Sequence, residues 1–251
     1  MKNNEERTIE IIELCLLAGK IMLQSGAETY RVEDTMSRIA TSFSVHGSHS
    51  YVTPTVIIFS VDGTVPTKLI RISDRTTDLR KVTLVNGISR RISGGELTLE
   101  EAFCELRKID LANLAFPLWL QIVAASISSG CFLMMFSGIA SDFIPAMLTG
   151  GLGFIALIYV HKLVEIKFFA EFLASLVIGS TALLLVNAGA GQELDKIIIG
   201  SVMPLVPGLL ITNAVRDLMA GHLVSGLSKG AEAFLTAFAI GTGIAVVFSF
   251  Y

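Results

Sequence analysis

The sequence predicts a membrane protein with a small α+β domain followed by a five-helix transmembrane domain. Apolar residues make up 52% of the 251 residues and charged residues only 16%, and the mean hydropathy is +0.68. Of the 19 Lys and Arg residues, 14 precede residue 115, as do 15 of the 22 Asp and Glu residues. We therefore expect a folded cytoplasmic domain over residues 1–114 and a transmembrane domain over residues 115–251.

The first domain is predicted to begin with two helices. Apolar residues recur at helical spacing from Thr8, until SGAET at residues 25–29 interrupts the pattern and Gly26 can end the helix. A second amphipathic helix is expected from about Thr29. Its apolar face comprises Val32, Met36, Ile39 and Phe43.

A β-hairpin is predicted next. The runs YVTPTVIIFSV and TVPTKLIRIS are rich in β-branched residues, and Asp62-Gly63 between them is a turn pair. Pro54 and Pro66 should mark strand edges or strand starts, since proline cannot donate to a sheet.

Two further helices carry recognisable start signals. Thr77 or Asp78 can cap the third, and Thr98 with Glu101 forms a capping box that opens the fourth, which should run through about Ile109. The apolar face expected for the third helix comprises Leu79, Val82, Val85, Ile88 and Ile92.

The first domain carries no motif of an enzyme. It has no phosphate-binding loop, nucleophile elbow or Cys/His cluster, and we expect neither catalysis nor a cofactor. His46 and His49 have no further ligands nearby, so no metal site is predicted. The net charge of −3 gives no indication of nucleic-acid binding.

Five membrane spans are expected in the second domain. They are about Phe116–Phe136, Phe143–Val160, Phe168–Asn187, Ile197–Val215 and Ala231–Tyr251. Basic residues favour alternate connections. These residues are Arg107 and Lys108, then Lys162 and Lys167, then Arg216 and Lys229. The positive-inside rule then places the first domain in the cytoplasm and the C-terminus outside.

The fourth span contains a predicted break. Ile197–Val215 carries no charge, yet Pro204 and Pro207-Gly208 lie near its middle. Proline removes a backbone donor, so the helix should kink or divide there. In lipid the freed carbonyls need partners. The break is therefore either a packing kink or part of a substrate site of the transporter kind.

Polar residues gather at the cytoplasmic ends of the later spans. Asn213 and Asp217 share one helix face, with Arg216 beside them, while Glu171 begins the third span and Glu232 begins the fifth. They could be interfacial charges that meet lipid headgroups. They could also form a vestibule where Arg216 holds a substrate carboxylate, Asn213 supplies hydrogen bonds, and Asp217, Glu171 or Glu232 takes a proton.

Four segments resemble the threonine/serine exporter family. They are LAGKIMLQSGAETYRVEDTMSRIA, VTPTVIIFS, TDLRKVTLVNGISRRISGGELTLEEA and PLVPGLLITNAVRDLMAGHLVSGLSKGAEA, and the resemblance covers nearly the whole chain. It implies a bacterial inner-membrane exporter of small amino acids or of dicarboxylates such as succinate. It also implies a second membrane module, either fused or separate. Because the sequence ends at Tyr251, it resembles the larger subunit of a split, two-component member.

These features predict outward transport of a small carboxylate metabolite, driven by the proton gradient. The backbone opened at Pro204, Pro207 and Gly208 would complete the substrate site. A short second membrane subunit or a homo-oligomer would close the transport path. The alternative is a membrane-tethered cytoplasmic enzyme or sensor whose spans only anchor it, although five spans with a broken helix exceed what an anchor needs.

Overall fold

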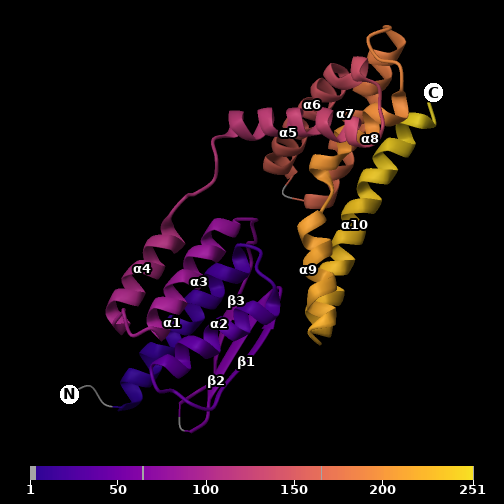
Figure 1. Cartoon of the computed structure of the whole chain (residues 1–251). Helices are drawn as coiled ribbons and strands as arrows, with labels where there is room; N and C mark the ends of the chain where they lie inside the picture. Colours follow the sequence, from indigo (N-terminus) through magenta and orange to yellow (C-terminus); the bar gives the residue numbers. More distant parts are fainter. Residues whose placement is uncertain (1–3, 64, 165, 251) are drawn as a thin grey trace. The chain divides into compact units, whose positions relative to one another are not determined.

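The computed structural model describes residues 4–63, 65–164 and 166–250, with the elements labelled in Figure 1. The chain forms two compact units. The sheet-containing unit comprises Met1–Ala115 and Leu209–Gly230, and the apolar unit comprises Phe116–Gly208 and Ala231–Tyr251. The sheet-containing unit thus includes a stretch, Leu209–Gly230, that lies within the transmembrane domain expected from the sequence.

The first helix lies at the centre of the sheet-containing unit. The helices of residues 4–115 are α1 (Asn4–Gln24), α2 (Thr29–Ser42), α3 (Leu79–Ser93) and α4 (Leu99–Leu111). Helix α1 packs against the other three and against the sheet. Ile11, Ile12, Leu14 and Cys15 are all buried, so more than one face of α1 is covered, as in a core helix. Burial raises the pKa of the Cys15 thiol to about 12.

The sheet has three antiparallel strands in the order β1-β2-β3. They are β1 (Ser48–Thr53), β2 (Val56–Val61) and β3 (Lys68–Arg71). The expected hairpin is confirmed as β2 and β3, and the connection between them begins with Asp62-Gly63. The structure divides the run before Asp62 into two paired strands at Pro54, which was expected to mark a strand edge or a strand start. Thr53 pairs with Val56, so the chain reverses at Pro54, which has no N–H to continue a paired strand.

Both predicted helix starts are confirmed. The Asp78 side chain accepts hydrogen bonds from Arg80 N at 3.1 Å and Lys81 N at 3.2 Å, and Thr98 and Glu101 form a capping box. On α3 the expected inward residues are buried except Leu79, which is 49% exposed. Leu79 is the first residue of the helix and is not part of the hydrophobic core cluster.

The apolar unit is built of helices. They are α5 (Leu118–Met135), η1 (Ala140–Asp142), α6 (Phe143–Val164), α7 (Lys167–Asn187), α8 (Leu194–Val202) and η2 (Met203–Leu205), followed by the part of α10 (Leu223–Phe248) from Ala231 onward. The buried residues of its core are mostly aliphatic and small, and include Leu133, Ala146, Ala174, Ile178 and Ile240.

The expected spans are present as helices. In the described residues, α5, η1 with α6, α7 and α10 are each long and apolar enough to cross a membrane. A fifth span results if α8, η2 and α9 (Gly208–Met219) are one broken span. The break falls at the predicted place, because α8 ends at Val202 and the backbone of Val206 is extended, with φ −62° and ψ 129°.

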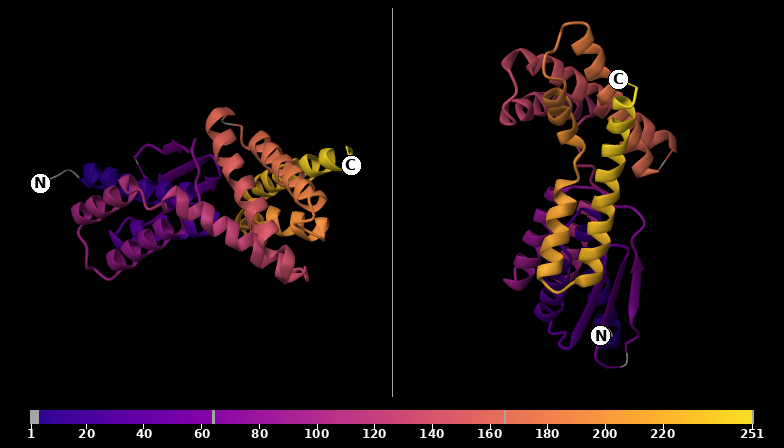
Figure 2. Two further views of the ribbon diagram at one scale, coloured as in Figure 1. Left: turned by 90° about the horizontal axis from the view of Figure 1, so that it is seen from above. Right: turned by 90° about the vertical axis from the view of Figure 1, so that its right-hand side faces the viewer.

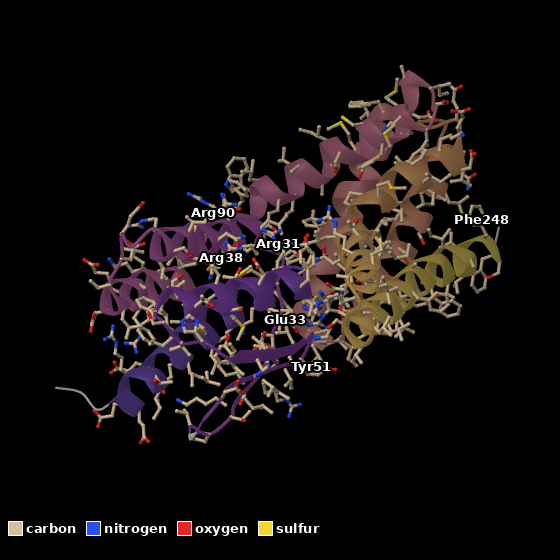
Figure 3. The ribbon with its side chains drawn as sticks, turned by 60° about the horizontal axis from the view of Figure 1, so that its bottom comes forward. Arg31, Glu33, Arg38, Tyr51, Arg90 and Phe248 are labelled. Carbon is tan, nitrogen blue, oxygen red and sulfur yellow. The ribbon has the colours of Figure 1, made fainter. Side chains whose placement is uncertain are left out.

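Charged side chains distinguish the two units. Arg31, Glu33 and Arg38 extend from α2 and Arg90 from α3, whereas Phe248 at the end of α10 presents an aromatic ring that is 45% exposed (Figure 3). Apolar side chains that are exposed in this way are suited to lipid contact.

Candidate functional site

The candidate site begins at the junction of α1 and α2. The SGAET segment ends α1 as predicted, and Gly26 has a φ of +88°, which permits a tight reversal. Glu28 occupies the N-cap position of α2 but makes no side-chain capping bond. The amide groups at the start of α2 therefore require another acceptor.

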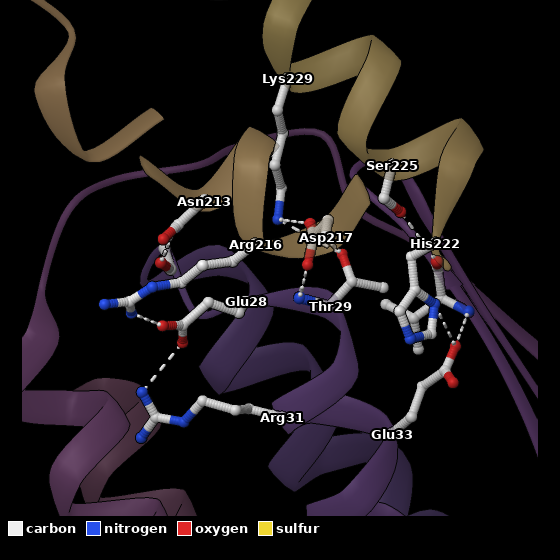
Figure 4. Close-up of polar contacts among 12 residues, drawn as sticks. Glu28, Thr29, Arg31, Glu33, Asn213, Arg216, Asp217, His222, Ser225 and Lys229 are labelled. Carbon is white, nitrogen blue, oxygen red and sulfur yellow. Dashed lines mark hydrogen bonds and ion pairs between the residues drawn. The ribbon is translucent and has the colours of Figure 1, made fainter. Parts of the chain in front are cut away.

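Asp217 of α9 supplies that acceptor. Its Oδ1 accepts a hydrogen bond from the Thr29 amide at 2.9 Å, and its Oδ2 accepts one from the Thr29 hydroxyl at 2.9 Å (Figure 4). Asp217 has no exposed surface. A carboxylate at a helix N-terminus is also favoured by the helix dipole. Helix α2 is thus capped by a residue 188 positions further along the chain.

Lys229 of α10 balances the charge of Asp217. Its Nζ lies 2.7 Å from Asp217 Oδ2 and 3.3 Å from Thr29 Oγ1. The Lys229 side chain is only 5% exposed. Two buried charges require a close partner and further hydrogen bonds, and Asp217, Lys229 and Thr29 provide these to one another.

Arg216 binds a second carboxylate, that of Glu28. The Glu28 side chain is 6% exposed and also accepts a hydrogen bond from Arg31 Nη1 at 2.9 Å. Burial alone would raise the pKa of the Glu28 carboxyl, but backbone hydrogen bonding and the two guanidinium groups outweigh it and hold the pKa below its ordinary value. The Arg216 side chain itself remains 56% exposed.

Asn213 completes the contacts of α9. Its Nδ2 donates to the Gly26 carbonyl at 2.9 Å. Asn213, Arg216 and Asp217 therefore lie on a shared part of the helix surface, as their spacing predicts, and each contacts the α1–α2 junction (Figure 4).

A second group of polar contacts involves the edge of the sheet. Glu33 Oε1 accepts from the Val52 amide at 2.9 Å and lies 3.8 Å from His222 Nδ1. Ser225 Oγ donates to the Val52 carbonyl at 3.1 Å. Burial is the main reason that the pKa of Glu33 is raised, against the opposing effects of the Val52 amide and His222.

The helices that carry these groups pack closely. Leu209–Gly230 holds most of α9 and the first residues of α10, which run side by side (Figure 2). A Cβ added to Gly226 would lie 2.5 Å from Leu218 Cγ and 3.0 Å from the Ala214 carbonyl. Only glycine permits this approach, which fixes the positions of Asp217 and Lys229 relative to each other.

The sequence prediction missed most of this cluster. The missed residues are Glu28, Thr29, Glu33, His222, Ser225 and Lys229. A signal was available, because the SGAETYRVE segment carries acidic residues and the segment from Asn213 to Lys229 carries basic ones. No local pattern, however, reveals that the two segments are in contact.

The residues of the predicted break lie in the apolar unit. Pro204 is in η2, and Pro207 separates η2 from α9. Gly208 begins α9, and a Cβ at that position would meet nothing within 4 Å among the described residues. Close packing therefore does not explain glycine there.

The two remaining acids of the prediction also lie in the apolar unit. Glu232 of α10 forms an ion pair with Lys167 of α7 at 3.0 Å. Glu171 of α7 is 4% exposed, and its Oε2 has no hydrogen-bond partner in the described part of the chain. In that part there is also no group of three His, Cys, Asp or Glu residues that could hold a metal ion.

The apolar helices define the chain as a multi-pass membrane protein. A family model described as "Putative threonine/serine exporter" matches residues 13–251. The chain therefore belongs to the threonine/serine exporter family, in agreement with the resemblance of its motifs. No solved structure matches the chain.

Three curated proteins are similar to the chain. A protein of Klebsiella aerogenes named "Probable succinate transporter subunit YjjP" is 26% identical over 262 residues, covering 100% of this chain and 98% of that protein. The protein of the same name from Escherichia coli is 25% identical over 260 residues, with the same coverage. A "Probable threonine/serine exporter" of Mycobacterium tuberculosis is 23% identical over 239 residues, which are 92% of this chain but only 44% of that protein.

Proposed function

We propose that this chain is a subunit of a bacterial inner-membrane transporter that exports a small carboxylate-bearing metabolite and is driven by the proton gradient. Membership of an exporter family supports outward transport. The relatives are named for succinate and for threonine and serine, and all three molecules carry a carboxylate. The carboxylate is therefore the group that we assign to the substrate site.

The proposal rests mainly on the environment of Arg216. Its guanidinium already binds the carboxylate of Glu28, while more than half of its side chain stays exposed. A guanidinium matches a carboxylate through paired N–H donors. We assign the substrate carboxylate to Arg216, in competition with Glu28, and a hydrogen bond to the Asn213 amide. We also propose that the helix break at Pro204, Pro207 and Gly208 exposes backbone groups that bind the substrate.

The proposed topology places the sheet-containing unit in the cytoplasm and the C-terminus outside. The distribution of Lys and Arg among the connections supports it. So does the composition of the unit, because the connection from Arg216 to Lys229, which follows the expected fourth span, folds with residues 4–115 and should lie on the same side of the membrane. The positive-inside rule, applied separately, assigns residues 4–115 and this connection to the cytoplasm.

A second membrane subunit is part of the proposal. The two relatives that match over 98% of their length are named as subunits, and the mycobacterial protein continues well beyond the matched region. Transporters commonly form the substrate path between two membrane modules. A separate short membrane chain is the partner we favour, and a homo-oligomer of this chain is the other arrangement.

Reconstitution tests the proposal. The chain is placed in proteoliposomes at checked orientation, alone and with a short co-expressed membrane chain, and threonine, serine or succinate is loaded in turn. We expect efflux of one of these only with the partner present and with a proton gradient. Efflux from a demonstrated monomer would refute the need for a partner. No efflux from any assembly, together with full membrane insertion, would favour the anchored enzyme or sensor.

A further inference from the structure

Glu171 is a buried carboxyl in the apolar unit. It lies on α7 and is 4% exposed, and the described residues include no ion pair to it within 4.0 Å and no hydrogen-bond partner for its Oε2. A carboxylate in an apolar helix bundle is costly unless it is paired or neutralised. The other two acids named from the sequence differ, because Asp217 is paired with Lys229 and Glu232 with Lys167.

Thr236 of α10 is the polar neighbour of Glu171. Its side chain has no exposed surface, and its hydroxyl also lacks a hydrogen-bond partner among the described residues. The hydroxyl is near enough to the Glu171 carboxyl to affect it electrostatically, although neither Thr236 Oγ1 nor Glu171 Oε2 has a hydrogen-bond partner among the described residues. Native structures satisfy nearly all buried polar groups, so two unsatisfied groups in one place require an explanation.

Helices α7 and α10 pack closely where Gly243 faces α7. A Cβ added to Gly243 would lie 2.0 Å from Ser175 Oγ and 2.5 Å from the Phe172 carbonyl. Phe172 directly follows Glu171 along α7, and Ser175 lies one turn after Glu171. The two helices that carry Glu171 and Thr236 are thus closely packed, and a proton needs no cavity between them.

Three charged groups act on Glu171 from the surrounding helices. Lys167, one turn earlier on α7, and His161 on α6 favour its negative form, and Glu232 on α10 opposes it. Lys167 is already paired with Glu232 at 3.0 Å. A change at the Lys167–Glu232 pair would therefore alter the charges that act on Glu171.

We propose that Glu171 and Thr236 form a proton-binding site within the apolar unit, and that this site couples export to the proton gradient. A proton from water binds Glu171 Oε2, and the resulting O–H donates a hydrogen bond to Thr236 Oγ1. Release returns the proton to water and restores the carboxylate. The coupling role rests on the proposed export function, whereas the binding of a proton does not.

Infrared spectroscopy of the full chain in lipid nanodiscs tests proton binding without any transport. We expect a carbonyl stretch of a protonated carboxyl that titrates with pH, disappears in Glu171→Gln and shifts in Thr236→Val. Asp195→Asn, a change to an exposed carboxyl at the start of α8, should leave it intact. A spectrum that is the same in the wild type, Glu171→Gln and Thr236→Val would overturn the site.

Flux measurements then test coupling in the transport-competent assembly. Glu171→Gln should abolish efflux driven by a pH gradient while substrate exchange across the membrane continues. Thr236→Val should shift the pH dependence of efflux and serves as the second variant if Glu171→Gln does not insert. Gradient-driven efflux that survives in Glu171→Gln would refute coupling. An absence of efflux in the wild type, with the titrating band present, would contradict the export function and leave the proton site standing.

Discussion

Asp217 caps helix α2 by accepting hydrogen bonds from both the amide and the hydroxyl of Thr29. Lys229 neutralises the same carboxylate in a buried pair. Removal of one partner from a buried pair leaves an uncompensated charge, so Lys229→Met should lower the free energy of unfolding by about 3–5 kcal/mol. Thermal and denaturant unfolding of the solubilised chain measures this.

Two matched variants make that measurement specific. Lys68→Met breaks the more exposed pair of Lys68 with Glu13 and should cost at most about 1 kcal/mol. The double variant Asp217→Asn/Lys229→Met should recover part of the loss, because no charge remains buried alone. Equal effects of Lys229→Met and Lys68→Met would show that burial of the pair does not matter.

Glu28 should make the stability of the sheet-containing unit depend on pH. Its pKa is lower in the folded chain than the ordinary value, so it stabilises the fold at pH values above the ordinary carboxyl pKa of about 4.3. That contribution is lost as the pH falls through the lowered pKa. Glu28→Gln should flatten this acid-side loss in unfolding curves, whereas Glu100→Gln on the first turn of α4 should not. A wild-type loss that persists in Glu28→Gln would contradict the assignment.

Transport should depend on the guanidinium of Arg216. Arg216→Lys keeps the charge but loses the planar fork, and Asn213→Ala removes the neighbouring donor, so each should reduce export strongly while membrane insertion persists. Arg31→Lys is the control, because Arg31 also binds Glu28 but has no part in the proposed substrate site. Normal export by both Arg216→Lys and Asn213→Ala would return these residues to a structural role.

The proline break should be required for export and not for insertion. Pro204→Ala with Pro207→Ala restores backbone donors and allows α8 and α9 to join as one helix. Flux through the well-inserted double variant measures the effect, and we expect poor transport. Full transport would mean that the break serves packing alone.

Reporter fusions should confirm the topology. A reporter behind residue 251 should be active only in the external compartment, as should one inserted at Gly189, between α7 and α8. A reporter inserted at Ile166, between α6 and α7, should be active only in the cytoplasm. Cytoplasmic activity of the fusion behind residue 251 would contradict the five-span arrangement.

Features that depend on a few neighbouring residues could be predicted from the sequence. The caps at Asp78 and Thr98 and the break at Pro204 each depend on groups within a turn or two, and all three are confirmed. Pro54 was expected to mark a strand edge or a strand start, but the pairing of β1 with β2 across it was not predicted, because β-branched residues on both sides favour strands without specifying which strands pair.

The polar cluster could be predicted only in part. The spacing of Asn213, Arg216 and Asp217 indicates a shared helix face, because helical geometry relates residues four apart. Their partners Gly26, Glu28 and Thr29 are nearly two hundred positions away. A single sequence contains no local pattern that specifies such contacts.

The cap on α2 also sets an order of events during synthesis. Asp217 follows Thr29 by 188 residues, and at about 5–20 residues per second the ribosome needs roughly 10–40 s to make them. All of α5 to α8 is made in that interval. Until α9 is made, the first turn of α2 therefore has no cap from Asp217 and Glu28 has no ion pair with Arg216. Completion of this unit is consequently a late step of biogenesis, and a chain truncated before α9 leaves it unfinished.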